Sequence, residues 1–199
     1  MALTKQKLLK LSHKMSRFLR HKGKGFVKPD GFVEIHDLIN EISSPSDNVT
    51  LNDIIEIVRS CKKQRFTIRS SQIRCNQGHN KCIPVPDLET TKITFENIEE
   101  AGICAHGTTF EAFEKIQETG KLDRMERYEI HFAEKMPHDP TLKSGMRKSS
   151  NIVIILDVEK CLRDGIPLRK STNGVILSTG KDDTGAIPSE YFKEIIVVS

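Results

Sequence analysis

Three arginines in this 199-residue sequence stand where a guanidinium could face a bound anion. Arg20 lies next to His21 at the end of an expected helix, and Arg65 lies where a helix gives way to a strand. Arg147 follows a glycine-bearing turn and precedes the most apolar strand of the chain. Arginine presents a planar fork of N–H donors that matches phosphate oxygens and stays charged at any relevant pH. Together these residues could hold a phosphate, although each arginine alone is more typical of a surface ion pair.

The tripeptide His106-Gly107-Thr108 could form a turn that contacts a ligand. We expect it at the end of a strand that begins near residue 103 and directly before a helix. Glycine permits close backbone approach, and histidine and threonine side chains supply hydrogen-bonding groups. His131, in a segment of alternating polarity, could face a cleft or be a partnered histidine on a sheet face. Gln77-Gly78-His79 leaves the same two alternatives open.

Several well-known site motifs do not occur in the sequence. There is no GxGxxG, no GxxxxGK[ST] and no G-x-S-x-G, and Gly23-Lys24-Gly25 is too short to be a phosphate loop. These observations disfavour a dinucleotide-binding dehydrogenase, a P-loop enzyme and a serine hydrolase.

The five cysteines form no CxxC pair. With no expected signal peptide, an odd set of this kind predicts reduced thiols in a cytosolic or nuclear compartment. Cys75, His79 and Cys82 lie close enough along the chain to suggest zinc. A structural zinc site needs four ligands, however, and no second pair lies nearby. We therefore expect these three to be ordinary buried or half-buried residues.

Composition is that of a globular protein, with 37% hydrophobic and 29% charged residues, and no apolar run is long enough to cross a membrane. The net charge is only +4, but basic residues are concentrated before Cys82 while 87–118 leans acidic. A basic first half predicts a polyanionic partner such as nucleic acid.

An amphipathic helix is predicted over 5–21, because apolar residues recur at spacings of three and four. The same spacing makes a basic stripe on another face, which is either a solvated surface or a seat for a polyanion. The apolar residues are Leu8, Leu11, Met15 and Phe18, and the stripe consists of Lys10, Lys14, Arg17 and His21.

The rest of the first half predicts two more helices and a hairpin. A short helix is expected over 36–42, and Thr50 with Asp53 has the form of a capping box. The helix that follows should use an apolar set of Leu51, Ile54, Ile55 and Val58. Strands over 66–68 and 73–75 form the hairpin, so this half is typical of a winged helix.

Pro84 and Pro86 break regular structure, and 84–92 is predicted to be a linker. Beyond it the pattern changes to short strands and few helices. One helix should begin near Phe110 and end at Gly120, and an apolar run over 151–158 is typical of a buried strand. We therefore predict an α+β protein: a winged-helix lobe over 1–83, the linker over 84–92, and a mixed α/β lobe over 93–199.

Taken together, these segments resemble the RNA 2′-phosphotransferase family. They occur in the family's order and extend over 11–192, which is nearly the whole chain. In the first half the matching segments are Leu11-Ser12, Phe18-Leu19-Arg20-His21, Asp30-Gly31-Phe32-Val33, Lys63-Gln64-Arg65-Phe66, Ile73-Arg74 and Asn76-Gln77-Gly78-His79. In the second half they are His106-Gly107-Thr108, Ile130-His131, Ser144-Gly145-Met146-Arg147, Asn173-Gly174-Val175-Ile176-Leu177, Ile187-Pro188 and Tyr191-Phe192.

The resemblance implies a winged-helix RNA-binding lobe followed by an NAD-binding lobe with the ADP-ribosyltransferase fold. It implies that NAD is consumed as a co-substrate. An RNA with an internal 2′-phosphate, expected to be a tRNA, displaces nicotinamide to give a 2′-phospho-ADP-ribosylated RNA. The second step releases repaired RNA and ADP-ribose 1″,2″-cyclic phosphate. No metal, membrane or obligate protein partner is implied.

The family's catalytic Arg-His-Arg-Arg set falls on Arg20, His21, Arg65 and Arg147, with all four identities matched. We expect the arginines to act on the phosphate and His21 to transfer a proton, since its unperturbed pKa lies near neutrality. The resemblance assigns further residues to the NAD cleft or the phosphate seat beside it. These are His106, Gly107, Thr108, His131, Ser149, Ser150 and Asn151.

Two other functions share some of these features. A winged-helix nucleic-acid-binding module would explain the basic first half but not the complete set of arginines and histidine. A transferase that leaves ADP-ribose on a nucleic-acid terminal phosphate would use NAD but stop after the first step. A purely structural protein leaves the arginines and glycine turns without a role.

Overall fold

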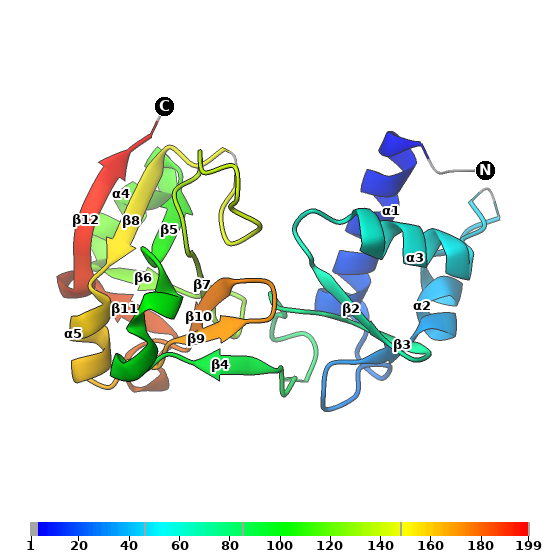
Figure 1. The fold of residues 1–199 in the computed structure, drawn as a ribbon, viewed down its shortest axis with the longest axis horizontal. Coiled ribbons are helices and arrows are strands. Elements are labelled where there is room, and N and C mark those ends of the chain that lie inside the picture. The colour runs from blue at the N-terminus through cyan, green and yellow to red at the C-terminus, as the bar shows by residue number, and fades with distance from the viewer. Residues whose placement is uncertain (1–3, 46, 85, 148, 199) are drawn as a thin grey trace. The chain divides into compact units, whose positions relative to one another are not determined.

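The computed structural model describes residues 4–45, 47–84, 86–147 and 149–198. The chain is a mixed α/β protein that divides into two compact units, Met1–Leu88 and Glu89–Ser199 (Figure 1). Among the described residues, no helix has the length and apolar character needed to cross a membrane.

The first unit packs three α-helices against a small antiparallel sheet whose strand order is β1-β3-β2. Its apolar core contains Leu11, Met15, Leu38, Ile54 and Ile73, which are all fully buried. Its elements are α1 (Lys5–Arg17), the π-helical turn η1 (Phe18–Lys22), β1 (Val33–Glu34), α2 (Ile35–Ile42), α3 (Leu51–Ser60), β2 (Phe66–Arg69) and β3 (Gln72–Cys75).

The helix predicted over 5–21 is present, but its last residues form a wider turn. The α-helical part ends at Arg17, and the backbone N–H of Gly23 donates to the carbonyl of Phe18 at 2.9 Å, an i→i+5 bond. π-helical turns of this kind occur often at functional sites, because they change the direction in which side chains project. Arg20 and His21 both lie on this turn.

The capping box predicted for α3 is confirmed. The Thr50 hydroxyl accepts from the Asp53 backbone N–H at 3.3 Å, and the Asp53 carboxylate accepts from the Thr50 N–H at 2.8 Å. The predicted apolar set is wrong at one end, because Leu51 is 51% exposed. Ile57 is buried beside Ile54 instead, since these two positions face the core.

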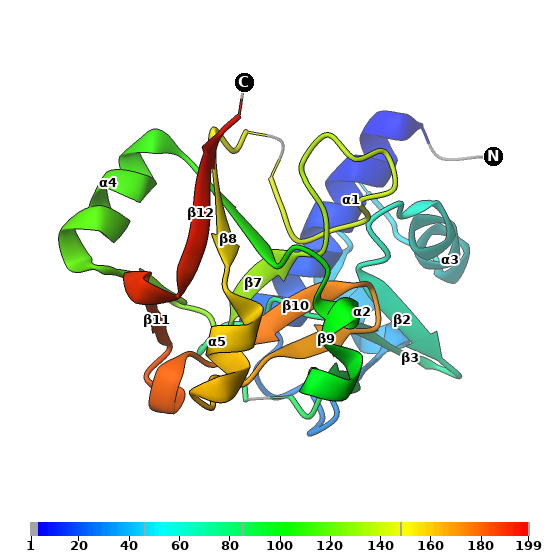
Figure 2. The ribbon, with the colours of Figure 1, turned by 60° about the vertical axis from the view of Figure 1, so that its left-hand side comes forward.

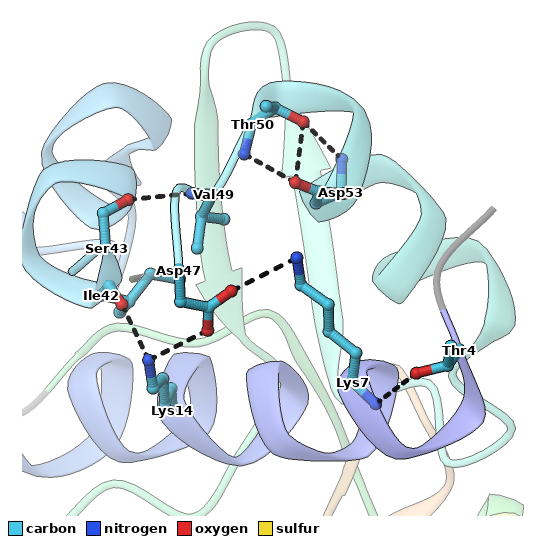
Figure 3. Close-up of polar contacts among 9 residues, drawn as sticks. All are labelled: Thr4, Lys7, Lys14, Ile42, Ser43, Asp47, Val49, Thr50 and Asp53. Carbon is cyan, nitrogen blue, oxygen red and sulfur yellow. Dashed lines mark hydrogen bonds and ion pairs between the residues drawn. The ribbon is translucent and has the colours of Figure 1, made fainter. Parts of the chain in front are cut away.

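The basic stripe on α1 is partly used inside the first unit (Figure 3). Lys14 Nζ donates to the Ile42 carbonyl at 3.2 Å and lies 3.5 Å from the Asp47 carboxylate. Lys7 Nζ lies 3.3 Å from the same carboxylate, and these partners hold the pKa of Asp47 below its usual value. Lys14 therefore ties α1 to the segment after α2, while Lys10 and Arg17 remain exposed.

The second unit is built on a seven-stranded antiparallel sheet with the order β12-β8-β5-β7-β10-β9-β4. A separate pair, β6 with β11, lies outside it, and α4 stands at the periphery of the unit with none of its residues buried (Figure 2). The strands are β4 (Thr90–Lys92), β5 (Ala105–Thr108), β6 (Lys121–Asp123), β7 (Ile130–Ala133), β8 (Ile152–Leu156), β9 (Arg169–Ser171), β10 (Val175–Ser178), β11 (Ala186–Pro188) and β12 (Phe192–Val197). The helices are α4 (Phe110–Thr119) and α5 (Val158–Arg163), with short 3₁₀ turns η2 (Phe95–Ala101), η3 (Lys181–Asp183) and η4 (Ser189–Tyr191).

Two local expectations differ from the structure in this unit. His106-Gly107-Thr108 ends a strand shortly before a helix, as predicted, but it does not form a turn, because all three residues belong to β5 and pair with β8. The last three residues of the 84–92 segment form β4, which pairs with β9 at the edge of the sheet. The expected helix end is confirmed, since Gly120 adopts the left-handed conformation with φ of +64°.

Candidate functional site

Arg20, His21 and Arg65 are brought together in the first unit. Cys75 is fully buried on β3, and both Arg20 and Arg65 act electrostatically on its thiol. Burial raises the pKa of the Cys75 thiol, while a hydrogen bond from Arg20 and the charges of the two arginines oppose that rise. Arg20 on η1 and Arg65 directly before β2 therefore both lie near the Cys75 thiol.

Arg65 is fixed by its backbone as well as by its side chain. Asn76 anchors this stretch, because its backbone N–H donates to the Arg65 carbonyl at 2.8 Å and its side-chain amide donates to the Gln64 carbonyl at 2.8 Å. Gln64 has a φ of +45°, an uncommon conformation for a residue with a side chain. The guanidinium Nη1 of Arg65 donates to the Cys61 sulfur at 3.5 Å.

Three cations surround the buried ring of His79 in the same unit. His79 is only 4% exposed, and its pKa is lowered to about 3 by burial first and then by the charges of Arg20, His21 and Arg74. Arg74 is itself buried, with one guanidinium nitrogen 3.2 Å from the Asp30 carbonyl. The cluster of Arg20, His21, Arg65 and Arg74 is suited to a multiply charged anion such as a phosphate.

A second group of candidate residues lies on neighbouring strands of the second unit. β5 pairs with β7 through Ala105 and Ala133, which places His106 and His131 close to one another. The His106 Nδ1 lies 2.9 Å from the His131 backbone carbonyl oxygen. A carbonyl only accepts, so Nδ1 carries the proton and Nε2 is the acceptor in the neutral ring. Burial lowers the pKa of His106, and the charges of Arg127 and Arg147 lower it further, so the ring is neutral near pH 7.

Arg127 joins this group although the sequence pattern did not single it out. Its Nη1 lies 3.4 Å from the Nδ1 of His131, four residues further along the chain. His131 is buried, whereas Arg127 is half-buried just before β7. In the sequence, Arg127 is distinguished only by lying four residues before the candidate histidine His131, and such a spacing is too common to indicate a site.

Gly107 is required because the segment after β7 packs directly on it. A Cβ at Gly107 would lie 2.3 Å from the Met146 Cγ and 2.6 Å from the Ser150 Oγ. The close approach predicted for this glycine is therefore made by the protein's own side chains. Asn151 supports the same segment, since its backbone N–H donates to the Thr108 carbonyl at 2.9 Å.

The remaining predicted residues lie around these two groups. Arg147 belongs to the second unit and is exposed, as is Ser149, whereas Ser150 is buried. The second unit thus brings His106, His131 and Arg147 together, while Arg20, His21 and Arg65 lie in the first. Among described side chains, no group of three or more His, Cys, Asp or Glu residues could hold a metal ion.

Comparison with known proteins assigns the chain to a family. Residues 6–180 match the family described as RNA 2'-phosphotransferase, Tpt1 / KptA family. The chain is 34% identical over 193 residues to a tRNA 2'-phosphotransferase 1 of Danio rerio, covering 92% of this chain and 83% of that protein. It is 34% identical over 197 residues to the Mus musculus protein of the same name, covering 94% and 76%. It is 31% identical over 199 residues to a tRNA 2'-phosphotransferase of Saccharomyces cerevisiae, covering 95% and 84%. The chain therefore belongs to the RNA 2'-phosphotransferase family.

Proposed function

We propose that this protein is an NAD-dependent RNA 2′-phosphotransferase that acts on a splice-junction 2′-phosphate, with tRNA as its expected substrate. The observation that carries the proposal is the grouping of Arg20, His21 and Arg65 in the first unit. Arg20 and Arg65 act electrostatically on Cys75, and Arg20 and His21 act on His79. A 2′-phosphate within an RNA chain is a compact dianion in a polyanionic setting, and clustered guanidinium groups are its natural partner.

The residues of the second unit fit NAD by their chemistry. Neutral His106 offers an acceptor nitrogen to a ribose hydroxyl, since its Nδ1–H is engaged by the His131 carbonyl. Arg127 supplies positive charge for a pyrophosphate, and Thr108 and Ser150 supply hydroxyl groups. NAD would provide the ADP-ribose that accepts the phosphate, so that the products are dephosphorylated RNA, nicotinamide and ADP-ribose 1″,2″-cyclic phosphate.

The protein's own residues then have distinct roles. Arg20, Arg65 and Arg147 orient the phosphate and stabilise the negative charge that develops on it during both steps. Preorganised donors aimed at developing charge usually make the largest contribution to catalysis. His21 holds or releases a proton beside the same phosphate, because an imidazole can both donate and accept a proton.

The fold of each unit supports assigning RNA binding to the first part of the chain and NAD binding to the second. We infer that 1–83, with three helices and an antiparallel sheet, is a winged-helix lobe that binds RNA. The part that carries the larger sheet, predicted over 93–199 and extended by β4 to 90–199, is then the ADP-ribosyltransferase-like lobe that binds NAD. The linker predicted over 84–92 is correspondingly shortened to 84–89.

The test is a short RNA with one internal 2′-phosphate, incubated with the protein in the presence and absence of NAD. We expect NAD-dependent loss of the phosphate and appearance of ADP-ribose cyclic phosphate. Arg65→Ala and Arg147→Ala should each lower the rate by about a hundredfold or more. Arg69→Ala and Arg163→Ala are matched controls, because Arg69 pairs with Asp30 on the surface and Arg163 is exposed at the end of α5.

Two outcomes would contradict the proposal in different ways. If RNA binds but keeps its phosphate with NAD present, the protein is a binding module. If ADP-ribose remains attached to a nucleic-acid terminal phosphate, the protein is a capping transferase that stops after one step.

A further inference from the structure

The segment that follows β3 folds around Arg20. A Cβ at Gly78, which has a φ of +91°, would lie 3.1 Å from the Arg20 Cζ and 3.2 Å from its Nε. The backbone N–H of Asn80 donates to the Arg20 carbonyl at 3.2 Å, and the Cys75 thiol is hydrogen-bonded to the Arg20 side chain. Residues from both ends of this segment therefore contact Arg20, and Gly78 lies against the plane of its guanidinium.

His79 lies in the middle of the same segment. His79 is only 4% exposed, yet neither ring nitrogen has a hydrogen-bond partner in the part of the chain that the structure describes. The Nε of Arg20 is buried and lacks a partner in the same sense. Buried polar groups are almost always hydrogen-bonded, so these atoms indicate a contact that completes the site.

We propose that His79 is a positioning residue, which together with Gly78 holds the Arg20 guanidinium in the orientation in which it meets the RNA phosphate. The inference rests on the proposed function in one respect only, that Arg20 binds the phosphate. His79 itself does not contact the reacting atoms and acts through Arg20.

The chemistry of the surroundings favours this role over proton transfer. Charged groups facing His79 are Arg20 and His21 from η1 and Arg74 from β3, and a further positive charge among them would be repelled. The low pKa of His79, about 3, agrees with a ring that stays neutral throughout the working range. A neutral imidazole has one acceptor nitrogen, which one buried water could link to the Arg20 Nε–H.

The first experiment compares two glycines that share an unusual backbone but differ in what they touch. Gly78→Ala and Gly25→Ala both place a side chain at positive φ, +91° and +101°, but a Cβ at Gly25 meets nothing within 4 Å. We expect Gly78→Ala to lower the turnover rate by about tenfold more than Gly25→Ala, which corresponds to the loss of one well-placed contact. Equal effects of the two substitutions would contradict the role given to Gly78.

The second experiment compares His79→Ala with His79→Asn, whose amide is neutral and can also accept a hydrogen bond. We expect His79→Ala to lower kcat by about tenfold with little change in NAD affinity, and His79→Asn to restore most of the loss. The pH profile of kcat should keep its shape in both variants. The role is refuted if His79→Ala turns over like the parent, or if His79→Asn removes one limb of the pH profile, which would make His79 a proton carrier.

A third readout does not depend on turnover. In a ¹⁵N-labelled protein the Arg20 Nε–H should give a signal protected from exchange, assigned by its disappearance in Arg20→Lys. That signal should be lost in His79→Ala and kept in His79→Asn. If the parent protein does not process the RNA but these signals behave as expected, the proposed function fails and the positioning contact stands. If the signal is unchanged in His79→Ala, the positioning contact fails whatever the activity.

Discussion

The imidazole Nδ1 of His106 lies 2.9 Å from the backbone carbonyl oxygen of His131, and this contact joins β5 to β7 in the centre of the larger sheet. It fixes the neutral tautomer of His106, because the carbonyl must receive the ring proton. The opposite nitrogen is then an acceptor, which is the property that we assign to NAD recognition.

Substitutions at His106 should separate its two nitrogens. His106→Asn keeps a donor near the Nδ1 position, so it should retain most of the parent's stability but bind NAD about tenfold more weakly. His106→Gln places an acceptor near the Nε2 position and should bind NAD better than His106→Ala. Calorimetric titration with NAD and urea unfolding measure the two effects. Equal NAD affinity in the Gln and Ala variants would show that the Nε2 acceptor is not used.

Folding stability should depend on pH through His79. Its folded-state pKa of about 3 lies below the ordinary value of 6.5, so the unfolded chain binds a proton more readily. The stability contributed by neutral His79 is therefore complete above pH 6.5 and declines as the pH falls toward 3. Between pH 7.5 and pH 5 the loss should be about 2 kcal/mol. Urea unfolding of the parent and of His79→Asn at both pH values measures it, and a constant difference between the two proteins would contradict the prediction.

RNA binding should distinguish the lysines and arginine of the α1 stripe. Lys10 and Arg17 are exposed, so Lys10→Ala and Arg17→Ala should each reduce the slope of log affinity against log salt by about 1. Lys14→Ala should have a smaller effect on that slope, because Lys14 is held by Ile42 and Asp47. Lys193→Ala, on β12 of the other unit, is the control. Equal slopes for Lys14→Ala and Arg17→Ala would contradict this division.

The cap of α3 should make a measurable contribution to stability. Thr50→Ala removes the acceptor for the Asp53 N–H, so the free energy of unfolding should fall by about 1 kcal/mol. Thr50→Ser keeps the hydroxyl and should stay close to the parent. Thermal unfolding of the parent, Thr50→Ala and Thr50→Ser tests this. A Thr50→Ala variant as stable as Thr50→Ser would show that the Thr50 cap does not stabilise the fold.

Gly145 should be among the least replaceable residues near Arg147. Its φ is +99°, and a Cβ there would lie 2.7 Å from the Ala133 Cα and 2.9 Å from the Phe132 carbonyl oxygen. Backbone atoms of β7 cannot move aside as a flexible side chain could. Gly165, with a φ of +75° and nothing within 4 Å of a Cβ, carries the backbone strain alone. Gly145→Ala should therefore destabilise the fold by about 2 kcal/mol more than Gly165→Ala in urea unfolding.

Local elements could be predicted where neighbouring residues determine the backbone. The Thr50 capping box, the left-handed Gly120 at the end of α4 and the hairpin around residues 70–71 all depend on contacts within a few positions. The exposure of Leu51 and the pairing of His106-Gly107-Thr108 with β8, where a turn was expected, could not be predicted in this way. Both depend on where the rest of the fold places the core and the partner strands.

The candidate phosphate ligands, Arg20, His21, Arg65 and Arg147, were proposed from the sequence, because residue type and order along the chain carry the resemblance to the family. Which side chains surround each of them was decided only by the tertiary structure. Lys14 is bound to Asp47, 33 residues away, and the Asn76 side-chain amide contacts Gln64 across 12 residues. Gly78, from the loop after β3, likewise lies against Arg20, which acts electrostatically on the neighbouring His79. Periodicity reports only which face of an element a residue lies on, whereas burial and electrostatics depend on what the folded chain brings against that face.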